Sequence, residues 1–268
     1  MSGTARQVLD LLERGTYEAP SGTRVSLADA QAGAVDGTRL YTPEAVAALS
    51  EPAPGAPARV SVTAESTQEA VVRLGAEGRV AALNFASARN PGGGFLNGAR
   101  AQEEDLCRCS GLYPCLRTQP AYYMANRRHD SLLYTDYLIF SPAVPFFRVR
   151  SRRAFLEDVV LVDVITAPAP NAGPLLRQDP AAGPAIAATF ARRWRNVLAV
   201  AAERGVERLV LGAWGCGAFG NDPAVASAAF ATVWPTWASS FREVVFAIPE
   251  KGRIGRLNHG AFRDAVSG

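Results

Sequence analysis

A series of short apolar runs that alternate with amphipathic segments constrains the fold of this chain more than any other feature. Strand-like runs cover residues 59–63, 79–86, 137–149, 157–170, 206–214 and 243–248. Segments with helical periodicity lie between them, the clearest at residues 65–78 and 183–205. Apolar, β-branched runs that end at glycine or proline are typical of buried strands. Strands that alternate with helices predict an α/β sheet covered by helices on both faces.

The first part of the chain has a different pattern. Residues 5–14 are predicted to form one short helix and residues 43–49 a second. The sequence EPAPGAPA at residues 51–58 has the proline-, alanine- and glycine-rich composition of a linker. We therefore expect residues 1–57 to form an N-terminal accessory segment packed on the main body, which is residues 58–268.

The composition makes several classes of function improbable. The chain has 268 residues and is 48% hydrophobic, enough for a sizeable core. Its formal net charge is +3 and no dense Lys/Arg tract occurs, so we expect no direct nucleic-acid binding. No apolar run approaches the ~20 residues that span a bilayer, and the N-terminus lacks the pattern of a signal peptide. The expectation is a cytoplasmic protein without membrane contact, whose four cysteines are free thiols.

Two glycine-rich loops follow strong predicted strands. The first contains Gly92, Gly93 and Gly94, and the second is GAWGCGAFGND at residues 212–222. Loops of this kind converge beyond the C-terminal ends of the strands, where α/β proteins bind their ligands. Because glycine leaves backbone N–H groups unobstructed, each loop can bind phosphate, and two loops predict a diphosphate site. A single such loop can also be simply a tight turn, and the first loop does not follow the GxGxxG spacing of dinucleotide-binding folds.

An acidic pair lies just beyond the first loop. Gln102, Glu103 and Glu104 are predicted at the start of a helix, with Leu106 and Leu112 on its buried side. Glutamate in a first turn can simply complement the helix dipole. A carboxyl group that faces a cavity near phosphates, however, experiences desolvation and negative charge. Both keep a proton available for general acid catalysis.

The spacing of these residues resembles a known signature. Three glycines, seven intervening residues and Gln-Glu-Glu resemble the GGG-x(6–8)-QEE signature of poly(ADP-ribose) glycohydrolases, most closely the short bacterial-type enzymes. The resemblance extends over roughly residues 58–250. It implies a macrodomain-like fold, with a mixed sheet flanked by helices. It also implies hydrolysis of ribose–ribose O-glycosidic bonds in poly(ADP-ribose), or action on ADP-ribosylated proteins, with ADP-ribose as product and no cofactor or metal ion.

The resemblance further implies a role for each matching residue. Glu104 would be the catalytic acid and base, and Glu103 would bind the riboses beside the scissile bond. Phe219 would press on the terminal ribose. Phe246 would stack on adenine or lie in the core, and Glu65 or a neighbour would read the edge of the base. The implied residues that hold ribose hydroxyls, enclose the diphosphate or otherwise contact substrate are Asn90, Gly92, Gly93, Gly94, Gln102, Gly215, Cys216, Gly217, Ala218, Phe219, Gly220 and Phe246.

Two other functions are compatible with these residues. A macrodomain that only binds ADP-ribose would not need the acidic pair, whereas an enzyme that removes single ADP-ribose units from proteins would look similar. The spacing of Cys107, Cys109 and Cys115 fits buried thiols better than a zinc site. Cys216 could be a nucleophile, but the sequence places no histidine to activate it. Residues 122–130, which mix tyrosine with arginine, either contact an extended polymer or form a solvated surface.

Overall fold

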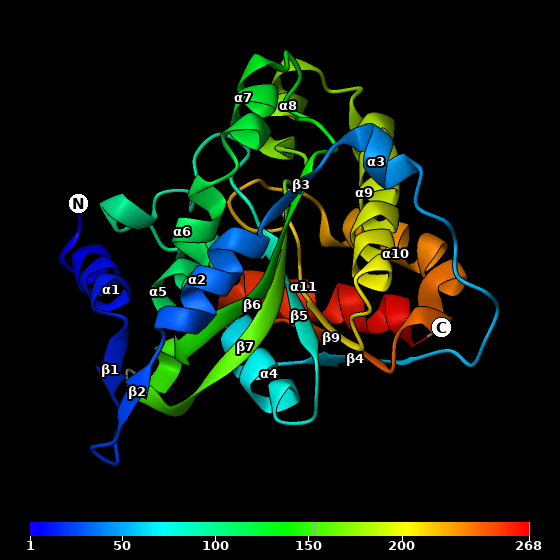
Figure 1. Cartoon of the computed structure of the whole chain (residues 1–268). Coiled ribbons are helices and arrows are strands. Elements are labelled where there is room, and N and C mark those ends of the chain that lie inside the picture. The colour runs from blue at the N-terminus through cyan, green and yellow to red at the C-terminus, as the bar shows by residue number, and fades with distance from the viewer. Residues whose placement is uncertain (153, 268) are drawn as a thin grey trace.

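A seven-stranded mixed sheet forms the centre of the computed structural model, which describes residues 1–152 and 154–267 (Figure 1). In spatial order its strands are β3 (Arg39–Tyr41), β6 (Leu138–Arg148), β7 (Phe155–Ala167), β5 (Val80–Phe85), β8 (Arg208–Leu211), β9 (Glu243–Ala247) and β4 (Arg59–Thr63). The last five run parallel, whereas β6 is antiparallel to both of its neighbours. The predicted α/β class with a mixed sheet is confirmed.

Helices cover both faces of this sheet and create two hydrophobic cores (Figure 1). One core includes side chains from α1 (Gly3–Arg14), α2 (Ala28–Gly37), α4 (Thr67–Gly75), α5 (Gln102–Cys109), α6 (Leu112–Arg117) and α7 (Pro120–Arg128). The other includes side chains from α3 (Pro43–Ala47), α8 (Ala172–Gln178), α9 (Gly183–Glu203), α10 (Pro223–Trp237) and α11 (Gly252–Val266). In the described part of the chain, no helix is long and apolar enough to cross a membrane.

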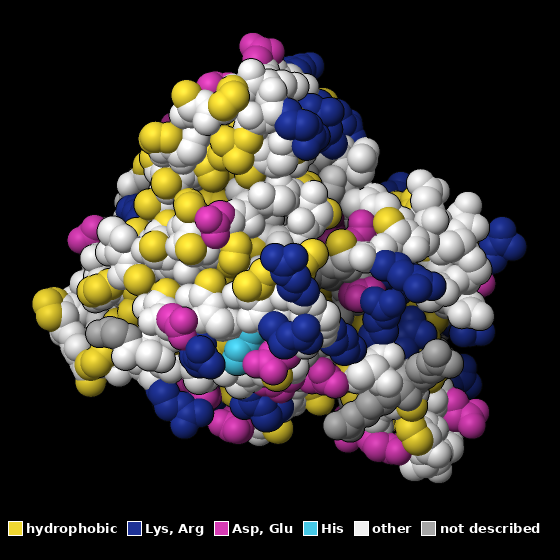
Figure 2. Space-filling model, turned by 180° about the vertical axis from the view of Figure 1, so that it is seen from behind, with side chains coloured by type: hydrophobic (Ala, Val, Ile, Leu, Met, Phe, Trp, Pro, Cys, Tyr) yellow, Lys and Arg dark blue, Asp and Glu magenta, His cyan; other side chains and the backbone are white. Residues whose placement is uncertain are grey.

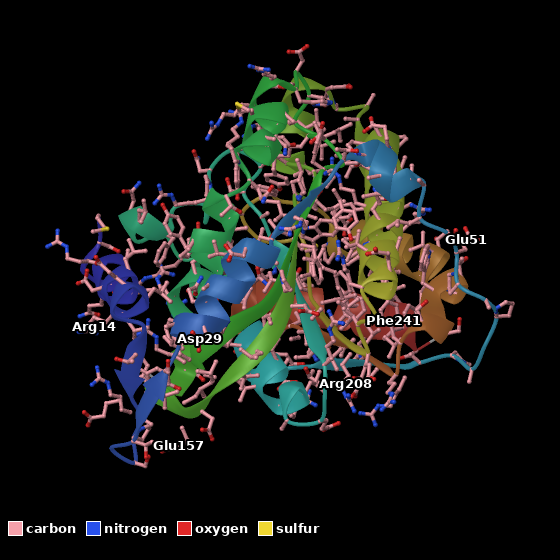
Figure 3. All side chains as sticks on the ribbon, viewed as in Figure 1. Arg14, Asp29, Glu51, Glu157, Arg208 and Phe241 are labelled. Atoms are coloured by element: carbon pink, nitrogen blue, oxygen red, sulfur yellow. The ribbon has the colours of Figure 1, made fainter. Side chains whose placement is uncertain are left out.

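The central strand β5 shows why the sequence needs helices on both sides. Val80 and Ala82 pack in one core, whereas Ala81 and Leu83 pack in the other, and all four are fully buried. Successive side chains of a strand point to opposite faces, so an uninterrupted apolar run requires both faces to be covered. Figure 3 shows side chains filling the space on both sides of the strands.

The segment before the linker is joined to the main sheet. Its strand β3 pairs antiparallel with β6, with Arg39 opposite Phe140. A short hairpin, β1 (Thr16–Glu18) and β2 (Arg24–Ser26), precedes it. The sequence did not predict β3 because three residues carry too little periodicity to identify a strand. The domain boundary at residue 57 stays a prediction.

Helix ends follow the local capping signals, with one correction. Gly15 ends α1 in the left-handed region at φ 66°, and the Asp222 side chain accepts a hydrogen bond from the Ala224 N–H at the start of α10. The helix that begins at Gln102 was predicted to include Leu112. It ends earlier, because the backbone at Ser110 is extended, and Leu112 begins α6 instead.

Candidate active site

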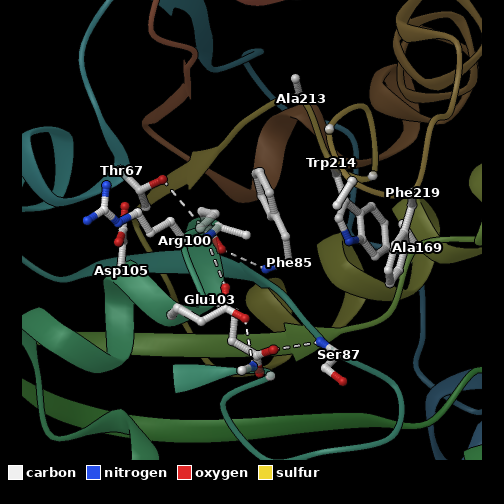
Figure 4. A pocket seen from close by; sticks show the side chains of 18 of the residues that line it. Thr67, Phe85, Ser87, Arg100, Glu103, Asp105, Ala169, Ala213, Trp214 and Phe219 are labelled. Atoms are coloured by element: carbon white, nitrogen blue, oxygen red, sulfur yellow. Dashed lines mark hydrogen bonds between the residues drawn. The ribbon is translucent and has the colours of Figure 1, made fainter. Parts of the chain in front are cut away.

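A cavity of about 1050 Å³ opens at the C-terminal edge of the parallel strands. The segment after each of the five strands contributes to its wall, within residues 66–68, 87–105, 169, 213–219 and 248–258. A cavity of this size accommodates a nucleotide-sized ligand. Figure 4 shows Arg100 and Glu103 toward one end, Trp214 and Phe219 toward the other, and Phe85 between them.

Glu104 lies in the first turn of α5, where two backbone groups hold its carboxylate. Its Oε1 accepts a hydrogen bond from the Gly94 N–H at 2.8 Å, and its Oε2 accepts one from the Ala101 N–H at 3.0 Å. The contact with Ala101 is the return half of a helix capping box. Only 7% of Glu104 is exposed, and it lines the cavity. The carboxylate is therefore fixed at the cavity wall.

Glu103 is buried more deeply and is held by the end of β5. Its Oε2 accepts a hydrogen bond from the Ser87 N–H at 2.7 Å, and its Oε1 accepts one from Asn84 Nδ2 at 3.2 Å. Burial raises the pKa of Glu103 to about 8, although the hydrogen bonds from Ser87 and Asn84 oppose the shift. Burial therefore favours the protonated form of Glu103.

Gly93 lies on the cavity wall directly against both carboxyl groups. Its φ is 56°, a conformation that favours glycine. A Cβ at this position would lie 2.4 Å from Glu104 Oε1 and 3.0 Å from Glu103 Oε2. A side chain at position 93 would therefore occupy the space in which oxygen atoms of both carboxyl groups lie. Glycine at position 93 is required by the backbone and by the acidic pair together.

Gln102 connects the acidic helix to its neighbours. Its Nε2 donates to the Leu83 carbonyl at 2.8 Å and to Thr67 Oγ1 at 3.3 Å, and its Oε1 accepts from the Phe85 N–H at 2.9 Å. Both N–H groups of the amide are paired within the protein. The contacts fix α5 against the end of β5 and the start of α4.

The second glycine-rich loop is fixed to the loop that follows β7. Gly215 has φ 75°, and a Cβ there would lie 2.6 Å from both Ala169 Cβ and Asn221 Nδ2. Asn221 Nδ2 donates to the Pro170 carbonyl at 2.7 Å and to the Gly215 carbonyl at 2.9 Å. These contacts define the loop backbone, which is the group expected to bind a diphosphate.

Most of the residues singled out in the sequence lie on the cavity wall. They come from both loops and from α5, and are Asn90, Gly93, Gly94, Gln102, Glu103, Glu104, Gly215, Gly217, Ala218 and Phe219. Three others do not line the cavity. Gly92 and Cys216 are buried, whereas Gly220 is exposed outside it.

Phe246 lies in the hydrophobic core, so the prediction that it stacks on adenine is wrong. It is fully buried, and its ring centroid lies 4.7 Å from that of Phe230 and 5.0 Å from that of Phe262. Because side chains alternate along a strand, the next residue, Ala247, reaches the cavity instead. Glu65 forms an ion pair with Arg73.

Two further groups of candidates also lie in the core. All four cysteines are buried free thiols. Burial raises the pKa of Cys109 and Cys115 to about 11 and that of Cys216 to about 12, which disfavours the nucleophilic thiolate at neutral pH. Tyr122 and Tyr123 are 0% and 2% exposed, so the aromatic side chains in this segment are core residues.

Several residues at the site were not singled out in the sequence. Asn84 and Ser87 hold Glu103, while Phe85, Thr67 and Trp214 line the cavity. The signal that identifies Asn84 is its position as a single amide in an apolar strand, because a buried polar group needs partners. No comparable sequence signal identifies Thr67. This residue lies at the site only because of the order of the strands in the folded sheet.

The arrangement suits proton transfer to a bound sugar. Two carboxyl groups line one cavity, burial favours the protonated form of Glu103, and the neighbouring loops can present backbone N–H groups to an anion. Carboxyl groups are the usual acids and bases of glycoside hydrolysis. The site therefore fits a phosphate-bearing glycoside.

Comparisons with known proteins agree with this chemistry. The family model described as the microbial-type PARG catalytic domain matches residues 5–149. Poly(ADP-ribose) glycohydrolase from Thermomonospora curvata is 46% identical with a TM-score of 0.90, over 98% of this chain and 97% of that chain. A structure of poly(ADP-ribose) glycohydrolase from the same organism, bound to the inhibitor ADP-HPD, is 46% identical with a TM-score of 0.88. The match covers 97% of this chain and 96% of that chain.

A second organism gives a similar result. Poly(ADP-ribose) glycohydrolase from Deinococcus radiodurans in complex with ADP-ribose is 43% identical with a TM-score of 0.80, over 88% of this chain and 96% of that chain. No curated protein matches the chain. The macrodomain-like fold that the resemblance implied is confirmed by these structural matches. Since the family model covers more than half of the chain, the chain belongs to the family of microbial-type poly(ADP-ribose) glycohydrolase catalytic domains.

Proposed function

We propose that this chain hydrolyses ribose–ribose O-glycosidic bonds in poly(ADP-ribose) and releases ADP-ribose. Family membership supports the reaction, and the relatives that bind ADP-HPD and ADP-ribose support the ligand class. The observation that carries the proposal is the buried carboxyl pair. One of its members accepts hydrogen bonds from the first glycine-rich loop and from the start of α5, and both face the cavity.

In the proposed mechanism Glu104 acts twice. Glu104 begins the reaction protonated, and as an acid it donates that proton to the leaving ribose oxygen while the bond from that oxygen to the anomeric carbon breaks. The anomeric carbon gains oxocarbenium character, and water then attacks it. The Glu104 carboxylate takes the proton of that water, which yields ADP-ribose and restores the acid. The N–H groups of Gly94 and Ala101 support this role, because they hold the carboxylate in place through both steps.

Glu103 is proposed to position the substrate. Because burial raises its pKa to about 8, its protonated form is favoured, and that form can donate a hydrogen bond to a ribose hydroxyl beside the scissile bond. Asn90 is proposed to bind the terminal ribose and Phe219 to press on it. The backbone of Gly93, Gly94 and residues 215–219 is proposed to enclose the diphosphate.

The decisive experiment compares wild type with Glu104→Gln on automodified poly(ADP-ribose). We expect free ADP-ribose from the wild type and almost none from the variant, with ADP-ribose affinity unchanged by calorimetry. Binding without release by the wild type would instead identify a reader of ADP-ribose. Release from singly modified protein but not from polymer would identify a mono-ADP-ribosyl-protein hydrolase.

We also propose two features of organisation. Residues 58–268 would form the catalytic domain and residues 1–57 an accessory segment, which the linker composition at residues 51–58 supports. A cytoplasmic location is supported by four free thiols, which persist in reducing compartments.

A further inference from the structure

A second, basic cavity adjoins the first one. It has a volume of about 370 Å³, and its wall carries four arginines, Arg100, Arg108, Arg148 and Arg150. Ser2 and Thr4 from the N-terminal end of the chain also line it. We call this cavity the arginine pocket. Figure 2 shows basic side chains close together on the right of one face of the molecule, with an acidic side chain among them.

The arginine pocket has an excess of positive charge. Asp105 is the one carboxylate that pairs with these arginines in the described part of the chain, and it is shared by Arg108, at 2.7 Å, and Arg150. The remaining partners are neutral carbonyl groups: Arg108 donates to Ala99 and Arg148 donates to Arg108. One carboxylate cannot neutralise four guanidinium groups, so the pocket is suited to an anion.

Part of this charge is held in place and part is free to reach a ligand. The Arg148 guanidinium lies over the rings of Phe147 and Phe155, 5.8 and 5.7 Å from their centroids. Arg150 is 45% exposed, and Arg100 has no ion-pair or hydrogen-bond partner among the described residues. Planar guanidinium groups bind the oxygens of phosphate or carboxylate groups in pairs, so the pocket is suited to a phosphate.

The arginine pocket shares part of its wall with the proposed catalytic cavity. Arg100 lines both cavities, and Asp105 lines the first while it pairs with arginines of the second. The next residue after Arg100 is Ala101, whose N–H holds Glu104. Figure 4 shows Arg100 and Asp105 at the end of the first cavity that is away from Phe219. A chain that leaves the cavity past Glu104 on this side therefore meets the arginine pocket.

We propose that the arginine pocket binds the diphosphate of the ADP-ribose unit on the leaving side of the scissile bond. This inference rests on the proposed function, because only a polymer has a second diphosphate. The terminal unit occupies the first cavity, its anomeric carbon lies at Glu104, and the next unit extends over Arg100. The pocket thus contributes to the affinity for polymer without contacting the bond that is cut.

A second arginine cluster shows that the proposal does not follow from arginine content alone. Arg59, Arg73, Arg208 and Arg242 also surround a small cavity, together with Glu77 and Glu243. Each of these arginines has a carboxylate partner. Because Arg59, Arg208 and Glu243 are the first residues of their strands, this cluster lies at the opposite edge of the sheet (Arg208 is labelled in Figure 3).

The test compares two substrates and two charge reversals. One substrate is long poly(ADP-ribose). The other is ADP-ribose linked through its anomeric carbon to the 2′-oxygen of adenosine, which has the same scissile bond but no second diphosphate. Arg150→Glu should lower kcat/KM on polymer by at least about tenfold through a higher KM, and should leave the adenosine-terminated substrate unchanged. Arg242→Glu, at an arginine that is 69% exposed, is the matched control and should change neither.

Each other outcome has a defined meaning. If wild type cleaves both substrates and Arg150→Glu does not change the ratio of their kcat/KM values, the arginine pocket has no role and the inference is overturned. An equal loss on both substrates overturns it too, because a subsite for the second unit acts on polymer alone. Arg150→Gln, which removes the charge without reversing it, supplies a second variant with the same expected selectivity for polymer and a smaller effect. If wild type cleaves neither substrate, the proposed function itself fails.

Discussion

At one end of the main cavity, side-chain oxygens receive hydrogen bonds from the backbone, whereas at the other end the backbone itself faces the cavity. Glu103 and Glu104 each accept hydrogen bonds at both carboxyl oxygens and are almost fully buried. The loop at residues 213–219 instead presents glycine, alanine and a half-buried Phe219. Proton transfer needs a carboxyl group fixed in place, while diphosphate binding needs exposed N–H groups.

Glycine has a different function at each end. At the acidic end Gly93 leaves room for carboxyl oxygens, and at the other end Gly215 allows two loops to approach each other. A substitution at Gly93 should therefore affect chemistry, and one at Gly215 should affect binding and stability. The following predictions, from the largest expected effect to the smallest, test this division.

Glu104→Gln should reduce kcat on poly(ADP-ribose) by about 10²–10⁴-fold, because the amide cannot donate and accept the catalytic proton. ADP-ribose affinity should be retained, since glutamine preserves the acceptor for the Gly94 N–H. Single-turnover kinetics and calorimetry measure the two quantities. An undiminished rate would remove Glu104 from the mechanism and would leave the acidic end without its proposed function.

Gly93→Ala should lower kcat by up to about 100-fold, because a methyl group 2.4 Å from Glu104 Oε1 must displace the carboxylate. The control is Gly183→Ala at the start of α9, where a Cβ meets nothing within 4 Å. Steady-state kinetics and a thermal melt separate displacement from unfolding. A normal kcat in a folded Gly93→Ala protein would contradict the assignment.

Gly215→Ala should destabilise the protein by about 1–3 kcal/mol, because alanine is strained at φ 75° and its Cβ would contact Ala169 and Asn221. KM should rise more than kcat falls, in contrast to Gly93→Ala. Urea denaturation and steady-state kinetics provide both values. If kcat falls while KM stays constant, the proposed division between the two ends is wrong.

The pH dependence of stability should identify Glu103. Its pKa is raised to about 8 in the folded protein from an ordinary value of 4.5, so folding favours the protonated form. The contribution of this group to the free energy of unfolding is greatest below pH 4.5. It decreases by up to about 1.4 kcal/mol per pH unit as the pH rises toward 8, and above that pH it is constant. The difference in unfolding free energy between wild type and Glu103→Gln should follow this slope in urea titrations. A difference that does not vary with pH would show that Glu103 is not protonated on folding.

Much of the candidate site was predictable because glycine and adjacent acids are local signals. The Gly-Gly-Gly run, Gln102 to Glu104 and the second loop were all identified from sequence alone. Their partners were not, since Asn84 reaches Glu103 across 19 positions and Thr67 reaches Gln102 across 35. Hydrogen bonds of this kind depend on how α5 packs on β5, which no short window of sequence specifies.

The sequence by itself determined six of the seven strands of the main sheet, its clearest helices and the two loops, because side-chain alternation, capping and the freedom of glycine act within a few residues. Only the tertiary structure decided that β5 and β8 are neighbours, which brings two loops about 120 positions apart to one cavity. It also decided that Phe246 faces the core while Ala247 faces the cavity, since a shift of one residue exchanges the two faces of a strand. Strand order and side-chain facing depend on long-range packing, and they placed the arginine pocket beside Glu104.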